Sequence, residues 1–279
     1  MHANRFLKSI RLRNFLSYGP SAPSVDLLPL NVLIGPNSSG KSNLLEAVDI
    51  LRATPSDVTQ PIRDGGGVED YLWKGVVSKR VPTAEIEATV YYPEGKSPLK
   101  YRLAFTMVGQ RFEILDEAIE NPLPSPGEVD VYFYYRYQSG HPVLNVRAKV
   151  EAQAGTSEGR VSRSLRHEDV AVGQSILSER KDPDQYPEIT YLGNQFNKIR
   201  LYREWDLGRN TEPRKPQKTD LPGDFLSDSA DNLPLVPNNL ESRSETRSVI
   251  NKYLKKFNES AEAVTARLLG GTVQLVVHE

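Results

Sequence analysis

The feature that most constrains this chain is a glycine-rich loop at residues 35–42, which read Gly-Pro-Asn-Ser-Ser-Gly-Lys-Ser. The spacing matches G-x-x-x-x-G-K-[ST], the phosphate-binding loop called Walker A. Gly35 and Gly40 allow backbone conformations with positive φ, so that main-chain N–H groups can approach phosphate oxygens. Lys41 would supply a positive charge for the β- and γ-phosphates, and the Ser42 hydroxyl would be a ligand for Mg²⁺.

The segments on either side of the loop have the character that the motif requires. Residues 30–34 are an apolar run with the length and β-branching of a buried parallel strand. In residues 42–52, Leu44, Val48 and Leu51 recur at helical spacing. Strand, loop and helix together predict a site for a nucleoside triphosphate, and a glycine-rich turn that only resembles the loop is the less favoured reading. The residues expected to bind nucleotide are Gly35, Pro36, Asn37, Ser38, Ser39, Gly40, Lys41, Ser42 and Asn43.

The composition sets limits on the class of protein. A chain of 279 residues can form one large domain or two. Its charge is balanced, with 35 Lys and Arg against 36 Asp and Glu, so the total neither requires nor excludes nucleic acid. The absence of cysteine excludes disulfides, thiolate zinc sites and cysteine nucleophiles. The N-terminus lacks the apolar core of a signal peptide and no apolar run approaches ~20 residues, so we expect a cytoplasmic protein without a membrane partner.

Much of the chain after the first helix is predicted to be β-structure. Residues 5–16 alternate apolar and basic residues and predict a half-exposed strand, with Arg11 and Arg13 on one face. These arginines could be solvated, contact nucleic acid or reach the nucleotide. Residues 85–115 predict an antiparallel meander, on which acidic residues form the solvent-facing side. Further strands are expected at residues 25–28, 129–136, 143–148, 189–192 and 198–202.

The C-terminal third changes character at a segment rich in proline, asparagine and aspartate, residues 206–237, which predicts a linker or functional loop. A capping box at residues 242–245 predicts a helix, and residues 264–277 predict a β-hairpin. Residues 152–169 are expected to be an exposed loop or a weak helix. The expected domains are a lobe at residues 1–205 with an antiparallel β-subdomain, a linker at 206–240, and a helix plus hairpin at 241–279.

Two segments resemble the ATP-binding-cassette-like ATPases of the RecF, SMC and RecN group, and closely the stand-alone AAA family ATPases related to them. Residues 7–15 are similar to the opening strand of that group, with its basic residues and terminal Asn-Phe. Residues 31–47 follow its pattern N-x-x-x-G-x-N-x-x-G-K-S-N, then two hydrophobic residues, x and Ala. Asn37 and Asn43 are the distinguishing positions, because kinases and GTPases rarely have asparagine at both.

The resemblance implies an α/β fold, namely a phosphate-loop core of the ABC/SMC type with an antiparallel β-subdomain and a helical second lobe. It implies ATP and Mg²⁺ as ligands, and a homodimer or a partner chain that completes the ATPase. Nucleic acid is a candidate partner on the same ground. Members of the group often have a coupling glutamine between the two lobes; Gln195 and Gln217 are the candidates here, although neither lies in a recognisable motif.

The chain departs from the group in its catalytic motifs. Residues 268–272 superficially resemble the signature loop, and residues 273–279 superficially resemble the Walker B strand. We reject both, because a signature loop begins a helix, whereas Thr272 starts a β-branched run, and because His278 stands where a Walker B acid is needed. No catalytic residue is therefore assigned, and the second lobe is expected to be incomplete.

The expected function is that of the ATP-binding N-terminal part of an ABC/RecF/SMC-type ATPase. Hydrolysis would require a missing C-terminal half or a partner chain that supplies the signature and Walker B motifs. Lys41 and Mg²⁺ would then stabilise the charge that develops as water attacks the γ-phosphate. Two alternatives remain: a non-hydrolysing nucleotide-binding or assembly module from a truncated or split protein, and, more weakly, a P-loop kinase, which would need an arginine-rich lid.

Overall fold

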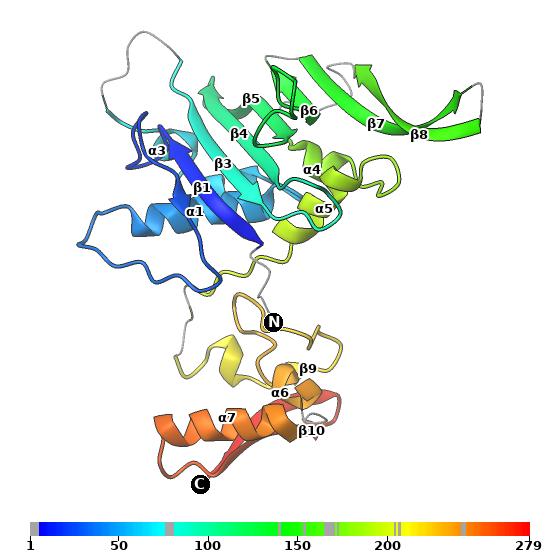
Figure 1. The fold of residues 1–279 in the computed structure, drawn as a ribbon. Coiled ribbons are helices and arrows are strands. Elements are labelled where there is room, and N and C mark those ends of the chain that lie inside the picture. Colours follow the sequence, from blue (N-terminus) through cyan, green and yellow to red (C-terminus); the bar gives the residue numbers. More distant parts are fainter. Residues whose placement is uncertain are drawn as a thin grey trace. The chain divides into compact units, whose positions relative to one another are not determined.

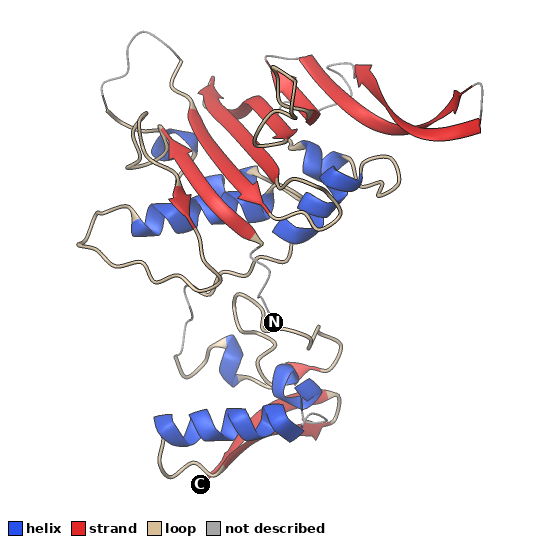
Figure 2. Cartoon of the chain, in the orientation of Figure 1, coloured by secondary structure: helices blue, strands red, loops and turns tan. Residues whose placement is uncertain are grey.

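The computed structural model describes residues 6–75, 81–138, 141–152, 155–164, 171, 173–203, 205, 208–240 and 244–279. The chain divides into two compact units, Met1–Ile199 and Arg200–Glu279. Both units combine helices with strands (Figure 2). The first is built on a large sheet and the second on a small one, so the fold is the mixed α/β type that the sequence predicts.

Eight strands form the sheet of the first unit, in the order β2-β1-β3-β4-β5-β6-β7-β8 (Figure 1). All neighbouring pairs are antiparallel, which confirms the predicted meander. The strands are β1 (Leu7–Arg13), β2 (Val25–Asp26), β3 (Ala84–Val90), β4 (Leu99–Val108), β5 (Arg111–Glu120), β6 (Phe133–Gln138), β7 (His141–Ala152) and β8 (Gly155–Ser164).

Helices pack against the apolar face of this sheet and share one hydrophobic core with it. They are α1 (Lys41–Ala53), α2 (Thr59–Asp64), α3 (Val68–Tyr71), α4 (Ile176–Glu179) and α5 (Pro187–Phe196). In β3, buried and half-buried residues alternate strictly, as expected for a strand with one face in the core. Helix α1 buries Leu44, Ala47 and Ile50 in the same core, and this packing positions the start of the helix relative to the sheet.

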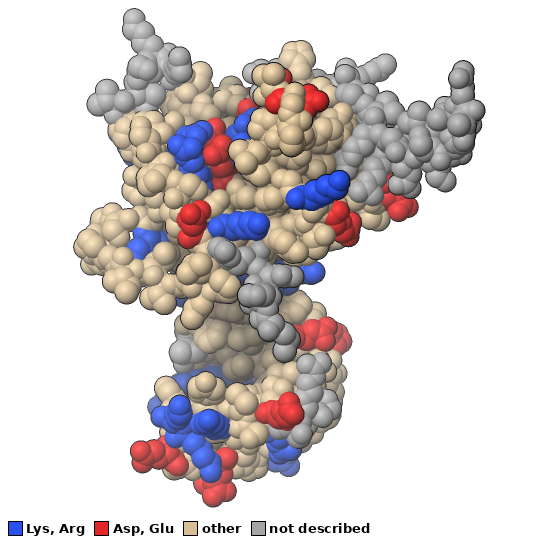
Figure 3. Space-filling view, in the orientation of Figure 1, with Lys and Arg blue, Asp and Glu red and all other residues tan. Residues whose placement is uncertain are grey.

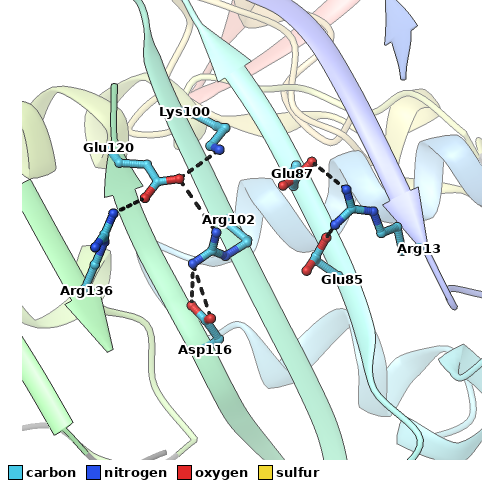
Figure 4. Close-up of polar contacts among 8 residues, drawn as sticks. All are labelled: Arg13, Glu85, Glu87, Lys100, Arg102, Asp116, Glu120 and Arg136. Carbon is cyan, nitrogen blue, oxygen red and sulfur yellow. Dashed lines mark hydrogen bonds and ion pairs between the residues drawn. The ribbon is translucent and has the colours of Figure 1, made fainter. Parts of the chain in front are cut away.

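The opposite face of the sheet carries ion pairs that run across the strands (Figure 4). Arg13 of β1 pairs with Glu85 and Glu87 of β3, so these acids lie on the solvent-facing side, as the alternation predicts. A second cluster, on the next three strands, joins Glu120 to Lys100, Arg102 and Arg136. The side chain of Glu120 is only 3% exposed, and its neighbouring cations lower its pKa against the opposing effect of burial.

Three elements predicted within residues 152–202 are wrong. Residues 189–192 belong to helix α5, which begins with a proline in its first turn and buries Ile189, Leu192 and Phe196 at helical spacing. Residues 198–202 form no strand. Residues 155–164 form strand β8 instead of a loop, because pairing with β7 satisfies the backbone hydrogen bonds of a segment with little apolar character. Residues 165–169 lie outside the described part.

The second unit consists of a three-stranded sheet with helices, in the strand order β10-β11-β9. Its elements are a 3₁₀ helix (Glu212–Arg214), β9 (Gln217–Lys218), α6 (Leu235–Leu240), α7 (Ser244–Phe257), β10 (Ala263–Leu269) and β11 (Thr272–His278). The predicted C-terminal hairpin is confirmed, and Gly270 and Gly271 form its turn with φ of 54° and 84°. Every helix among the described residues is too short or too polar to cross a membrane.

Candidate nucleotide-binding site

The phosphate loop leads directly into the N-terminus of helix α1, as the sequence predicts. Ser38 and Gly40 have φ of 64° and 88°, and Gly40 is the N-cap of the helix. The first helical hydrogen bond runs from Leu44 N to Gly40 O (3.0 Å), so the amide groups at the start of α1 have no partner within the helix. No acidic residue lies in the first turn. This end of α1 therefore offers N–H donors and the positive end of the helix dipole to an anion.

Lys41 extends back into the loop that precedes it. Its Nζ donates to Gly35 O (2.9 Å), Pro36 O (2.7 Å) and Ser39 Oγ (3.2 Å). Among the described residues no carboxylate forms an ion pair with this lysine, and its charge is satisfied only by neutral acceptors of the loop. An anion entering the loop would replace neutral acceptors with charged ones, and a charge-assisted hydrogen bond is the stronger of the two.

Two residues outside the predicted site lie against the loop. The Tyr18 hydroxyl donates to Gly40 O (3.1 Å), and Asn43 Nδ2 donates to Ser17 Oγ (2.8 Å). Partial burial raises the pKa of Tyr18, which keeps the phenol protonated and able to donate. Asn43, one of the two positions that distinguish the family pattern, thus connects helix α1 to the turn that follows strand β1.

That turn, at residues 14–18, has a restrained backbone. Asn14 and Leu16 have φ of 50° and 49°, and a positive φ is unusual for a residue as bulky as leucine. The turn is held by a bridge from Phe15 to Leu72 and by a hydrogen bond from Leu16 N to Tyr71 O (2.8 Å). The one sequence signal for Ser17 and Tyr18 is their position immediately after the family-like strand of residues 7–15.

The segment before the loop differs from its prediction. Residues 30–34 are not part of any strand, and Leu30, Val32 and Ile34 are 80%, 75% and 90% exposed. The described sheet is antiparallel and pairs with no residue of this segment. A run that is apolar on both sides needs neighbouring strands to cover it, and the described residues provide none. The prediction of a buried parallel strand is therefore wrong for this structure.

The other candidate residues do not join the loop through hydrogen bonds. Arg11 donates to Ala22 O (3.3 Å) and Arg13 pairs with Glu85, so both contribute to the polar face of the sheet. Gln195 lies in the last turn of α5. Gln217 lies in β9 of the second unit, where it is 6% exposed and donates to Glu212 O.

The chemistry of the site fits a magnesium nucleotide. Ser42 supplies the one hydroxyl predicted to be a metal ligand, and Mg²⁺ commonly takes one or two protein oxygens together with phosphates and water. The described residues contain no cluster of three or more His, Cys, Asp or Glu side chains that could hold a metal by itself. A metal at this loop would therefore depend on the phosphates of a bound ligand for most of its coordination.

Comparison with known proteins shows similarity to DNA repair proteins. The chain is 36% identical over 85 residues to "DNA replication and repair protein RecF" of Thermosynechococcus vestitus, which covers 30% of this chain and 19% of the relative. It is 35% identical over 102 residues to the protein of the same description from Oenococcus oeni, covering 36% and 24%. The alignments thus span about a fifth to a quarter of the length of these relatives.

A solved structure described as "Structural biochemistry of ATP-driven dimerization and DNA stimulated activation of SMC ATPases" is similar over 39% of this chain and 68% of that chain, with a TM-score of 0.32 and 19% identity. A family model described as "AAA domain, putative AbiEii toxin, Type IV TA system" matches residues 30–178. This range is more than half of the 279 residues and contains the phosphate loop, helix α1 and strands β3 to β8. The predicted relation to the RecF-like group is confirmed, and the chain belongs to this family of AAA-domain ATPases.

Proposed function

We propose that this chain binds Mg-ATP at the phosphate loop, through residues 35–43. The observation that carries the proposal is the position of Lys41 Nζ, which lies within hydrogen-bonding distance of Gly35 O and Pro36 O at the start of a 13-residue helix. The β- and γ-phosphates would take over these bonds from the carbonyl groups. The Ser42 hydroxyl would be the protein ligand of the metal, and a bound Mg²⁺ would neutralise part of the phosphate charge.

The chain's own residues would orient the phosphates. The first-turn amides of α1 would donate to phosphate oxygens, and Gly40 allows the backbone to approach them because it has no side chain. Tyr18 and Ser17 would hold this geometry. The Tyr18 hydroxyl donates a hydrogen bond to Gly40 O, and Ser17 Oγ accepts one from Asn43 Nδ2. This arrangement supports binding and leaves the activation of water to other residues.

We further propose that hydrolysis requires a carboxylate from another segment or from a second chain. The bonds of Lys41 among the described residues all go to neutral acceptors, so the acid that positions water would come from elsewhere. The exposed run at residues 30–34 supports this proposal, because strands beside it would cover its apolar side chains. A homodimer or a partner chain could supply both the strands and the acid.

Calorimetric titration with ATP and Mg²⁺ tests the binding. Lys41→Ala should weaken ATP binding by at least about tenfold, because the phosphates lose their charged side-chain partner. Lys218→Ala, at an exposed lysine of β9, is the control and should leave the affinity unchanged. An unmodified chain that does not bind ATP would contradict the whole proposal. Robust turnover by this chain alone, lost in Lys41→Ala, would contradict only the requirement for another carboxylate.

A non-hydrolysing assembly module is the second candidate function. It is favoured by the same exposed apolar run at residues 30–34. This run would be a binding surface for a partner, whether or not that partner supplies a catalytic acid. The two functions separate when a partner is added: turnover that begins on complex formation supports the conditional ATPase, and a stable complex without turnover supports the module.

Nucleic acid is a candidate partner because the relatives are described as DNA replication and repair proteins. Fluorescence anisotropy with labelled single- and double-stranded oligonucleotides, with and without Mg-ATP, tests this part of the proposal.

A further inference from the structure

Helix α7 of the second unit exposes a narrow apolar stripe. Val249, Tyr253 and Phe257 follow one another at intervals of four residues and are 51%, 64% and 93% exposed. On the neighbouring face of the helix, Ile250 and Leu254 are half-buried, and Ile250 lines a small cavity together with Val264 of β10. Three exposed apolar side chains in one row form a contiguous patch, and contiguous apolar patches are a feature of binding surfaces.

The same helix concentrates positive charge. It carries one acidic residue, Glu245, against the basic residues Arg247, Lys252, Lys255 and Lys256. At 100° per residue, Lys256 and Lys252 lie about 60° and 100° from Tyr253 on one side, next to the stripe. Lys256 Nζ lies 5.4 Å from the centre of the Tyr253 ring. Figure 3 shows Lys and Arg side chains gathered over this helix.

We propose that the stripe and its lysines bind an acidic amphipathic helix of a partner protein. Tyr253 and Phe257 are large anchors of the kind that dominate protein interfaces, and charged residues at the margin of such anchors select the partner by complementarity. An apolar ridge spaced at four residues fits between the side chains of a second helix. Acidic residues beside the partner's apolar stripe would meet Lys252 and Lys256.

Other occupants fit these observations less well. A second copy of α7 would bring an equal excess of positive charge against Lys252 and Lys256. A lipid surface needs a broad apolar face, whereas Ile250 and Leu254 of this helix are half-buried and only three apolar side chains are exposed. Single-stranded nucleic acid stacks on free ring faces, but Lys256 lies over the Tyr253 ring.

Fluorescence anisotropy of the full chain with two labelled peptides tests the proposal. Both are amphipathic helices of about 18 residues with leucines at helical spacing; one has glutamate beside the leucines and the other has lysine. The glutamate peptide should bind at least about tenfold more tightly than the lysine peptide, and added salt should reduce the difference. Phe257→Ala and Tyr253→Ala should each weaken binding by about tenfold.

A charge reversal provides the sharpest test. The double variant Lys252→Glu, Lys256→Glu should reverse the preference, so that the lysine peptide binds more tightly. Lys255→Glu is the matched control, because it makes the same change on the same helix but lies about 160° around the axis from Tyr253. That variant should keep the original preference.

Several results would overturn the proposal. Equal affinity for the two peptides, or a control that reverses the preference as strongly as the double variant, would exclude a specific acidic partner. Self-association that is lost in Phe257→Ala would assign the stripe to a second copy, and binding of phosphatidylserine vesicles or an oligonucleotide through Tyr253 would assign it to another class. A marked fall in the melting temperature of Phe257→Ala would show that the side chain is covered within the chain.

Discussion

Gly40 of the phosphate loop is restricted both by its backbone conformation and by its neighbours. Its φ is 88°, and a Cβ atom there would lie 3.0 Å from Ser17 Oγ and 3.3 Å from the Tyr18 ring. Both the backbone conformation and the tight space therefore favour glycine. The conformation of the loop thus depends on its own sequence and also on Ser17 and Tyr18, which lie in the turn that follows β1.

Gly40→Ala should consequently weaken ATP binding by at least about tenfold and lower the free energy of unfolding by about 1–2 kcal/mol. Calorimetry and urea denaturation measure the two effects. Gly271→Ala is a matched control, since Gly271 also has a positive φ of 84° but has no atom near its missing Cβ. It should lose a similar amount of stability and keep its affinity; equal affinities in both variants would contradict the role given to Gly40.

Glu117 is a buried acid that joins strand β5 to the start of α4. It is 1% exposed and accepts hydrogen bonds from Tyr101 OH (2.7 Å), Ile176 N (2.9 Å) and Ser175 Oγ. Burial raises the pKa of Glu117 from an ordinary value of 4.5 to about 7, although the three donors favour the ionised form. The folded chain thus binds this proton more tightly than the unfolded chain does.

This difference predicts a pH dependence of stability. The contribution of Glu117 is fully present below the ordinary carboxyl pKa of 4.5 and is lost as the pH rises through about 7. We expect the free energy of unfolding to fall by about 1–3 kcal/mol over this range, and Glu117→Gln to flatten the profile. Urea denaturation between pH 5 and 8 is the measurement, with Glu113→Gln in the same strand as the control. A flat profile for the unmodified chain would contradict the prediction.

At the scale of elements, substitutions in the exposed run at residues 30–34 should change the free energy of unfolding less than substitutions at buried positions of the sheet. Ile34→Ala should change the free energy of unfolding by less than about 0.5 kcal/mol, because Ile34 is 90% exposed. Ile86→Ala in β3 makes the same change at a side chain with 0% exposure and should cost about 2–5 kcal/mol. Chemical denaturation distinguishes the two; a cost at Ile34 as large as that at Ile86 would show that the run is buried in solution.

The elements show what the sequence can and cannot predict. Helix α1 and the meander were predicted because their apolar periodicity is regular and local. Helix α5 was not, because the short run at residues 189–192 has no clear period and its type depends on packing against the core. The passage from residues 35–42 into helix α1 was predicted from the local motif, whereas Tyr18 was missed because its contact with Gly40 joins residues that are 22 apart in the chain.

At the scale of the whole molecule, two units with separate sheets carry two different surfaces. The first contains the phosphate loop and the exposed run before it. The second contains the apolar and basic stripe of α7. The proposed nucleotide site and the proposed docking surface can therefore be tested independently, since substitutions in α7 lie outside the unit that holds the loop.

The ion pairs on the polar face of the first sheet limit how nucleic acid could bind there. Arg13, Lys100, Arg102 and Arg136 are already neutralised by acids on neighbouring strands. A nucleic-acid phosphate could pair with one of these cations only by breaking its ion pair, which would leave a carboxylate unpaired. This would cost the most free energy at Glu120, because its side chain is only 3% exposed. Counterion release on binding a polyanion should therefore come from cations other than these four.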